Sequence, residues 1–337
     1  MRFLSHHRKV RSALVLAVCA ATIGLVVAPR PGAASIPESA GAEEDRGGRQ
    51  DPVILRGESE PESAAPVEAS SEERIPGKLL PPDLGDRERP LIVLLHSYSG
   101  RVEDVVNNFA IGQVAVTSGW IIVAPAGLTD ALGRPYWNAT PTCCDRYLRG
   151  NDDVSYLRQF ITEAIERYPV DPSRVIVVGL SNGAFMAYRL ACDISDLVTA
   201  VVAISGVEPW DPSACTPSYP VSVLHVHGIY DRAVSFRGGS LSVLNEVWAP
   251  YPSAEETVRR WVDRNGCSAE DPITTTHTGG QAGFWFGCDL GTSVRYIWLP
   301  QGHRVKIDVS LVSSIKRFVD HVARAPVPPP SCAVGPC

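Results

Sequence analysis

Short apolar runs alternate with amphipathic stretches along the chain from residue 90 onward. The runs are rich in β-branched residues, which is typical of strands buried on both faces. They lie at residues 91–96, 120–125, 174–179, 198–205, 221–227 and 294–299. Helical spacing of apolar positions occurs between them, at residues 153–168, 182–192, 254–265 and 309–323. Strands that alternate with helices predict an α/β fold with a mostly parallel central sheet and helices on both faces.

The first 34 residues have the pattern of an export signal. Basic residues precede an apolar run at 12–28, and small residues follow at 32–34. This order predicts a cleavable signal peptide over residues 1–34 and an extracellular, secreted protein. The apolar run is short for a membrane span of about 20 residues, so we expect no stable membrane anchor. A lipid anchor at Cys19 is disfavoured because a bulky valine precedes it.

Three further segments follow the signal. Residues 35–74 contain 11 carboxylates and 4 arginines among many Pro, Ser, Gly and Ala, and such a segment buries too little apolar surface to offset its ordering entropy. We predict a disordered acidic linker there, one folded domain over residues 75–325 and an irregular tail rich in proline and cysteine over 326–337. The net charge of −6 gives no basic signal for nucleic acid. We therefore expect no nucleic-acid partner.

Eight cysteines remain once the signal is removed. They are Cys143, Cys144, Cys192, Cys215, Cys267, Cys288, Cys332 and Cys337. No zinc-type spacing of Cys and His accompanies them, so in an exported chain they predict disulfides rather than a metal site. The nearest sensible pairs are Cys267 with Cys288 and Cys332 with Cys337, although the sequence leaves the connectivity open.

A nucleophile motif lies between a predicted strand and a predicted helix. Residues 179–183, Gly-Leu-Ser-Asn-Gly, match the pattern G-x-S-x-G, which holds a serine hydroxyl clear of a sharp turn. The apolar run 175–178 precedes the motif and a helix-forming stretch at 184–190 follows it, as the motif requires. We interpret Ser181 as a catalytic nucleophile rather than as an incidental serine in a glycine-rich turn.

A serine nucleophile needs a general base and an acid that orients the base, and after this motif they follow in the order Asp or Glu, then His. Asp231 follows the strand at 221–227, and His303 follows the strand at 294–299. The carboxyl ends of parallel strands share one edge of a sheet. We therefore expect both side chains beside Ser181, with His303 as the base.

Other acids and histidines have simpler explanations. Asp152 and Asp153 precede a predicted helix and suit its N-terminal caps. His225 and His227 alternate along a predicted strand, so we expect them to face packed neighbours or hydrogen-bond acceptors.

A tetrahedral intermediate needs two preorganised N–H donors. Asn182 follows the nucleophile, and its backbone should supply one donor to this oxyanion hole. The loop 96–100 should supply the other, with Tyr98 as the first choice and Ser97 as the second. Acyl transfer by these groups needs no metal and no organic cofactor, and we expect neither.

Several separated segments are familiar as a set. They are residues 90–96, 137–138, 143–144, 152–154, 170–192, 225–234 and 265–267, which span most of residues 80–320. In this order they resemble the secreted polyhydroxybutyrate depolymerases and the feruloyl and acetylxylan esterases. The resemblance implies an α/β-hydrolase fold and a serine carboxylesterase with Ser181, Asp231 and His303 as its triad. Its substrate would be an ester, polymeric or small, of a plant polysaccharide or of a short polyhydroxyalkanoate.

The resemblance also suggests that Trp137 contacts substrate at the mouth of the site, although buried packing suits this residue equally well. Three features depart from the family. Ser97 stands where relatives usually have glycine, and residues 304–306 replace an aromatic residue and proline after His303. Residues 74–78 lack a clear early strand, so the first hairpin should be shortened or missing.

Two other functions compete with the esterase. A serine peptidase of the same fold would use the same triad, but such enzymes commonly carry an extra propeller or lid domain for which this sequence shows no room. A non-catalytic wall-binding protein would retain the fold without activity, and the unusual residues after His303 favour it slightly. The sequence leaves the natural ester and the oligomeric state open.

Overall fold

The computed structural model describes residues 77–79, 85–108, 114, 117–243, 246–268 and 271–322. The chain divides into two compact units, residues 1–67 and 68–337, and every described residue belongs to the second. The predicted signal peptide, acidic linker and C-terminal tail lie outside the described residues.

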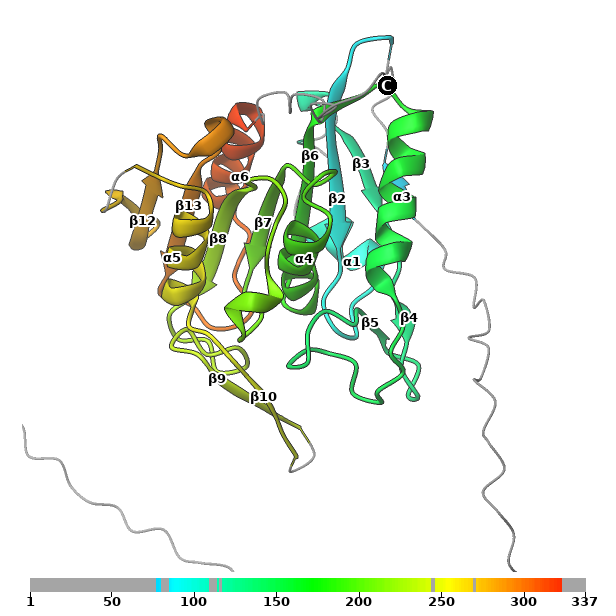
Figure 1. The fold of residues 1–337 in the computed structure, drawn as a ribbon, viewed down its shortest axis with the longest axis vertical. Coiled ribbons are helices and arrows are strands. Elements are labelled where there is room, and N and C mark those ends of the chain that lie inside the picture. The colour runs from blue at the N-terminus through cyan, green and yellow to red at the C-terminus, as the bar shows by residue number, and fades with distance from the viewer. Residues whose placement is uncertain are drawn as a thin grey trace, which may run out of the picture. The chain divides into compact units, whose positions relative to one another are not determined.

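A nine-stranded sheet forms the centre of the described part of the chain (Figure 1). From one edge to the other, its strands are β1 (Gly77–Leu79), β3 (Ile121–Ala124), β2 (Arg89–Leu95), β6 (Val170–Leu180), β7 (Ala200–Ile204), β8 (Ser222–Gly228), β13 (Val294–Leu299), β12 (Gly280–Trp285) and β11 (Ile273–His277). The six strands from β3 to β13 pair in parallel. β1 joins one edge by antiparallel pairing, and so do β12 and β11 at the other.

Helices cover both faces of this sheet. They are α1 (Val102–Asn108), α3 (Asp153–Arg167), α4 (Asn182–Asp193), α5 (Ala254–Arg264) and α6 (Val309–His321). Apolar side chains of α3, α4 and α5 share one core cluster with Leu91 and Val93 of β2, whereas α1 and α6 share the other with Ile92. Successive residues of a strand point to opposite faces. The predicted α/β fold with a mostly parallel sheet is therefore confirmed.

The loops at the carboxyl ends of the parallel strands lie at the lower edge in Figure 1. Two small hairpins lie at the same edge, formed by β4 (Leu128–Thr129) with β5 (Pro135–Tyr136) and by β9 (Gly239–Val243) with β10 (Glu246–Tyr251). Short 3-10 turns occur at Pro212–Ala214 and Asp289–Gly291. This edge is where the sequence predicts the catalytic residues.

The early strand and the start of α3 can be compared with the predictions from the sequence. The early strand is shortened, as expected, to the three residues of β1. Asp152 caps α3 by accepting a hydrogen bond from the backbone N–H of Ser155, which confirms its predicted role. Asp153 instead accepts from the backbone N–H of Asn138 at 2.7 Å. It therefore ties the start of α3 to the segment around Asn138 rather than capping the helix.

Three disulfides lie within the described residues: Cys143–Cys144, Cys192–Cys215 and Cys267–Cys288. The last is the pair that the sequence suggests, and the other suggested pair, Cys332 with Cys337, lies outside the described residues. None of these three bridges joins residues more than 23 positions apart. Each bridge therefore joins parts of the chain that are near each other in the sequence.

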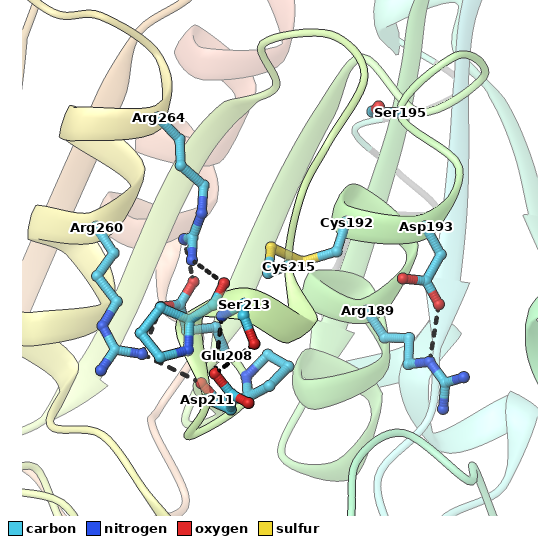
Figure 2. Close-up of a disulfide and its surroundings, with 12 residues drawn as sticks. Arg189, Cys192, Asp193, Ser195, Glu208, Asp211, Ser213, Cys215, Arg260 and Arg264 are labelled. Atoms are coloured by element: carbon cyan, nitrogen blue, oxygen red, sulfur yellow. Dashed lines mark hydrogen bonds and ion pairs between the residues drawn. A yellow bond between two sulfur atoms is a disulfide. The ribbon is translucent and has the colours of Figure 1, made fainter.

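The loop after β7 is held to two helices (Figure 2). Cys215 bonds to Cys192 of α4, and the buried side chain of Glu208 accepts hydrogen bonds from two arginines of α5. Arg264 donates at 2.5 Å and Arg260 at 3.1 Å. A buried carboxylate needs such partners because burial disfavours an unpaired charge. The loop therefore has a defined position beside the carboxyl edge of the sheet.

Candidate active site

Ser181 occupies a sharp turn between β6 and α4. Its backbone has φ 54° and ψ −117°, a conformation that projects the side chain away from both elements. A Cβ on Gly179 would lie 2.0 Å from the carbonyl oxygen of Gly183, and a Cβ on Gly183 would lie 2.3 Å from that of Leu95. Only glycine fits at these two positions, which is why the motif has them.

His303 and Asp231 lie beside this serine. Nε2 of His303 is 2.9 Å from Oγ of Ser181, and Nδ1 of His303 is 2.8 Å from Oδ2 of Asp231. The two residues follow β13 and β8, which are neighbours in the sheet. The structure thus brings together the three predicted residues from positions as far as 122 apart in the sequence.

Asp231 is buried and fully hydrogen-bonded. Its Oδ1 accepts the backbone N–H groups of Ala233 and Val234 at 2.8 and 2.9 Å. Burial by itself would raise the pKa of Asp231, but hydrogen bonds from His227 and His303 outweigh it and hold this pKa below its ordinary value. Asp231 is therefore ionised at neutral pH and favours the tautomer of His303 that carries hydrogen on Nδ1 and accepts at Nε2.

Asn182 and Trp137 lie beneath the turn, not at its mouth. The side chain of Asn182 accepts from the backbone N–H of Trp137 at 2.8 Å and donates to its carbonyl at 2.9 Å. The indole of Trp137 has no exposed surface, packs on the ring of His96 and donates to the carbonyl of His96 at 3.1 Å. Trp137 therefore supports the turn as buried packing and does not line the cleft over Ser181, which contradicts the substrate contact that the resemblance suggests.

A cleft of about 730 Å³ opens over Ser181 and His303. Small-molecule sites usually have volumes of about 300 to 1,000 Å³, so this cleft has the size of such a site. It is lined by Ser97, Tyr98, Gly100, Asp104, Leu180, Ser181, His303, Arg304, Val305, Lys306 and Ile307. The residues that depart from the family pattern, Ser97 and 304–306, thus line the cleft itself.

Tyr98 lines this cleft, and its side chain is held by contacts with charged neighbours. Its hydroxyl donates to Asp130 at 2.5 Å, and its ring lies 4.1 Å from the guanidinium carbon of Arg146. Burial, followed by the bond to Asp130, raises the pKa of Tyr98 to about 12. Asp130 also pairs with Arg134 at 2.8 Å. Asp130 was not predicted from the sequence, in which its only signal is its position beyond a strand at the catalytic edge.

The two residues predicted as oxyanion donors both lie close to the nucleophile. Asn182 is the first residue of α4, where backbone N–H groups have no partner in a preceding turn. Tyr98 borders the same cleft as Ser181. Across the described ranges, no group of three or more His, Cys, Asp or Glu side chains could hold a metal ion. No helix of these ranges is long and apolar enough to cross a membrane.

Comparison with known proteins agrees with this geometry. Residues 146–248 match the Phospholipase/Carboxylesterase family. Feruloyl esterase B of Piromyces equi is 27% identical over 213 residues, which are 62% of this chain and 38% of that protein. Probable feruloyl esterase C of Aspergillus niger is 27% identical over 233 residues, 66% of this chain and 73% of its own. This chain thus spans well under two thirds of the Piromyces protein.

The solved structure of an acetyl xylan esterase from Aspergillus awamori has the same fold. It superposes with a TM-score of 0.56 at 18% identity, covering 74% of this chain and 94% of its own. The fold and the serine turn define an α/β-hydrolase. In sequence the chain is similar to carboxylic ester hydrolases of that fold, the class that its resemblance to feruloyl and acetylxylan esterases implies.

Proposed function

We propose that this protein is a secreted serine carboxylesterase in which Ser181, His303 and Asp231 form the catalytic triad. The observation that carries the proposal is the unbroken contact from Ser181 Oγ to His303 Nε2 at 2.9 Å and from His303 Nδ1 to Asp231 Oδ2 at 2.8 Å. Serine, imidazole and carboxylate in this arrangement make a hydroxyl nucleophilic at neutral pH.

The reaction proceeds by acyl transfer. His303 Nε2 takes the Ser181 proton as Oγ attacks the ester carbonyl, and Asp231 stabilises the imidazolium that forms. Backbone N–H groups of Asn182 and Tyr98 bind the oxyanion. His303 then returns the proton to the departing alcohol oxygen, and an acyl-enzyme remains on Ser181. Water attacks this ester by the same route, which releases the acid and restores the serine.

We infer an acyl ester of a plant polysaccharide as the substrate from the relatives, and the cleft is compatible with such a group. Its walls combine the apolar side chains of Leu180, Val305 and Ile307 with the ring of Tyr98, and its 730 Å³ can hold an aromatic acyl group as well as an acetyl group. The similar proteins named above are two feruloyl esterases and an acetyl xylan esterase. Short polyhydroxyalkanoate esters are the second substrate class to test.

The cysteines support the proposed compartment. Disulfides persist in oxidising surroundings and are rare in the cytosol, and six cysteines of the described residues are paired. Export by a signal peptide at residues 1–34 stays a prediction. Sequencing the N-terminus of the exported protein tests it, and a mature protein that keeps its first residues would contradict it.

Ester hydrolysis is the direct test of the proposed activity. Turnover of p-nitrophenyl acetate, methyl ferulate and 3-hydroxybutyrate oligomers is measured for the wild type and for Ser181→Ala. Ser213→Ala serves as the matched control because it removes a hydroxyl from an exposed turn. We expect Ser181→Ala alone to abolish turnover, and the order of the three substrates to identify the class. A folded wild type without turnover would refute the proposal.

A further inference from the structure

Two histidines behind the proposed triad form a chain that the reaction above does not use. His225 and His227 alternate along β8, so both side chains point to the same face, and neither has exposed surface. Nδ1 of His225 is 2.6 Å from the hydroxyl of Tyr188 in α4, and Nε2 of His225 is 3.1 Å from Nδ1 of His227. Nε2 of His227 then lies 2.9 Å from the carbonyl oxygen of Val234.

This row of hydrogen-bonded side chains ends at the turn that carries Asp231. The same Nε2 of His227 lies 3.4 Å from Oδ2 of Asp231, the oxygen that contacts His303. Val234 in turn donates its backbone N–H to Oδ1 of Asp231 at 2.9 Å. His227 therefore contacts both the carboxylate and the backbone of its turn, and it fixes one relative to the other.

The donors and acceptors available fix the direction of every hydrogen bond in this row of side chains. The Val234 carbonyl and the ionised Asp231 carboxylate can only accept, so His227 must carry hydrogen on Nε2. Burial, followed by the neighbouring His227, holds the pKa of His225 well below its ordinary value, so His225 is neutral. If its one hydrogen is on Nε2, His227 accepts at Nδ1 and is neutral too. Tyr188 then donates to Nδ1 of His225, and every bond points toward Asp231.

The opposite orientation requires a charge in the core. A hydrogen on Nδ1 of His225 would leave its Nε2 as an acceptor, so His227 would need hydrogens on both nitrogens. A charged imidazole without exposed surface is disfavoured because burial removes its hydration. The neutral arrangement gives each nitrogen of the two rings at least one partner, and aromatic packing surrounds the rings. The ring of Tyr188 stacks on Trp261 with centroids 5.9 Å apart.

We propose that Tyr188, His225 and His227 form a buried positioning chain that holds the carboxylate of Asp231 in the orientation that His303 requires. These residues touch neither substrate nor the reacting atoms, so they act through Asp231 alone. The proposal rests on the proposed esterase function, because its catalytic consequence appears only if Asp231 belongs to the triad.

The ionisable groups around the chain lie at its two ends. His303 and Tyr251 face Asp231, and Glu208 and Arg264 act on Tyr188. Loss of the N–H of His227 would leave the Asp231 carboxylate with one donor fewer. A carboxylate with fewer donors attracts the imidazolium more strongly, so the acid limb of kcat/KM should move to higher pH.

The first experiment reads the chain without any turnover. Nitrogen NMR of the ¹⁵N-histidine-labelled wild type distinguishes the two tautomers and the charged ring of each histidine. We expect His225 and His227 both to be neutral with hydrogen on Nε2. Hydrogen on Nδ1 of His225, or a charged His227, would overturn the proposed orientation of the chain.

The second experiment measures kinetics in variants. His227→Leu should lower kcat roughly 10- to 100-fold, the range for one hydrogen bond to a charged group, with KM unchanged and the acid limb at higher pH. His227→Gln keeps an N–H donor and should recover most of kcat, and Tyr188→Phe should show a smaller loss in the same direction. Tyr296→Phe is the matched control because it also removes a tyrosine hydroxyl next to these rings, from a side chain that stacks on Trp298 and is not a member of the Tyr188–His225–His227 chain.

The outcomes separate the two proposals. Equal kcat and an unmoved acid limb in folded His227→Leu would overturn the positioning role while leaving the esterase intact. Equal losses in His227→Leu and His227→Gln would also overturn it, because the donor would then not matter. A wild type with the expected tautomers but no ester turnover would refute the esterase function alone.

Discussion

Asp231→Asn replaces one carboxylate oxygen by an amide group, and the contacts of Asp231 determine which one. Oδ1 accepts two backbone N–H groups, from Ala233 and Val234, so this position must remain an oxygen. The amide nitrogen is thereby directed to the position of Oδ2, where it meets the N–H of His303. Two donors then oppose each other. The imidazole relieves the clash by moving its hydrogen to Nε2, which can no longer take the Ser181 proton.

The expected loss follows from this wrong tautomer. A Ser-His-Asp triad with the same substitution loses about 10⁴-fold in kcat, which corresponds to about 5 kcal/mol of transition-state stabilisation at 1.36 kcal/mol per factor of ten. KM should change little, because Asp231 does not line the cleft. The assay is kcat and KM for p-nitrophenyl acetate, with thermal unfolding to show that the variant folds. A folded variant within tenfold of the wild-type kcat would refute the reasoning.

Three other changes test the turn, the Tyr98 loop and the cleft. Gly183→Ala brings a Cβ to 2.3 Å from the Leu95 carbonyl oxygen and should lower the unfolding free energy in urea by about 2 kcal/mol or more; an unchanged midpoint would contradict this. Burial alone would raise the pKa of Asp130, but its hydrogen bonds outweigh burial and lower this pKa to about 2. The charge of Asp130 therefore stabilises the fold above about pH 4, and this stabilisation is lost toward pH 2. Asp130→Asn should therefore flatten the acid loss of stability, and an equally steep loss would count against that account. Arg304→Gln with Lys306→Gln should lower kcat/KM roughly threefold for a carboxylate-bearing p-nitrophenyl ester relative to a neutral one, and an unchanged ratio would exclude attraction by the two cations.

The secondary structure of the central sheet could be predicted from neighbours in the chain. Residues 294–299 form β13 as the apolar run predicts, and helical spacing at 153–168 matches α3 to within one residue. The edge hairpin of β11 and β12 was not predicted. Every threonine of β11 is exposed, and β12 contains two glycines, so neither strand has the apolar run that identifies a buried strand.

The sequence by itself was enough to select Ser181, Asp231 and His303 as the candidate catalytic residues. The serine turn requires glycines at fixed spacing, and the acid and the histidine follow buried strands, so local patterns were enough to select them. Only the tertiary structure decided that they meet within hydrogen-bonding distance, because that depends on the pairing of β8 with β13.

The surroundings of these residues were decided by tertiary structure alone. Trp137 is as compatible with a surface as with a core in the sequence, and in the fold it is buried against His96 while its backbone bonds to Asn182, 45 positions away. The pattern of β8 indicates that His225 and His227 share a face, but their partners are Tyr188 on a helix and a turn beyond the strand. Contacts between distant segments depend on how strands pair and helices pack, and no local pattern of residues records that arrangement.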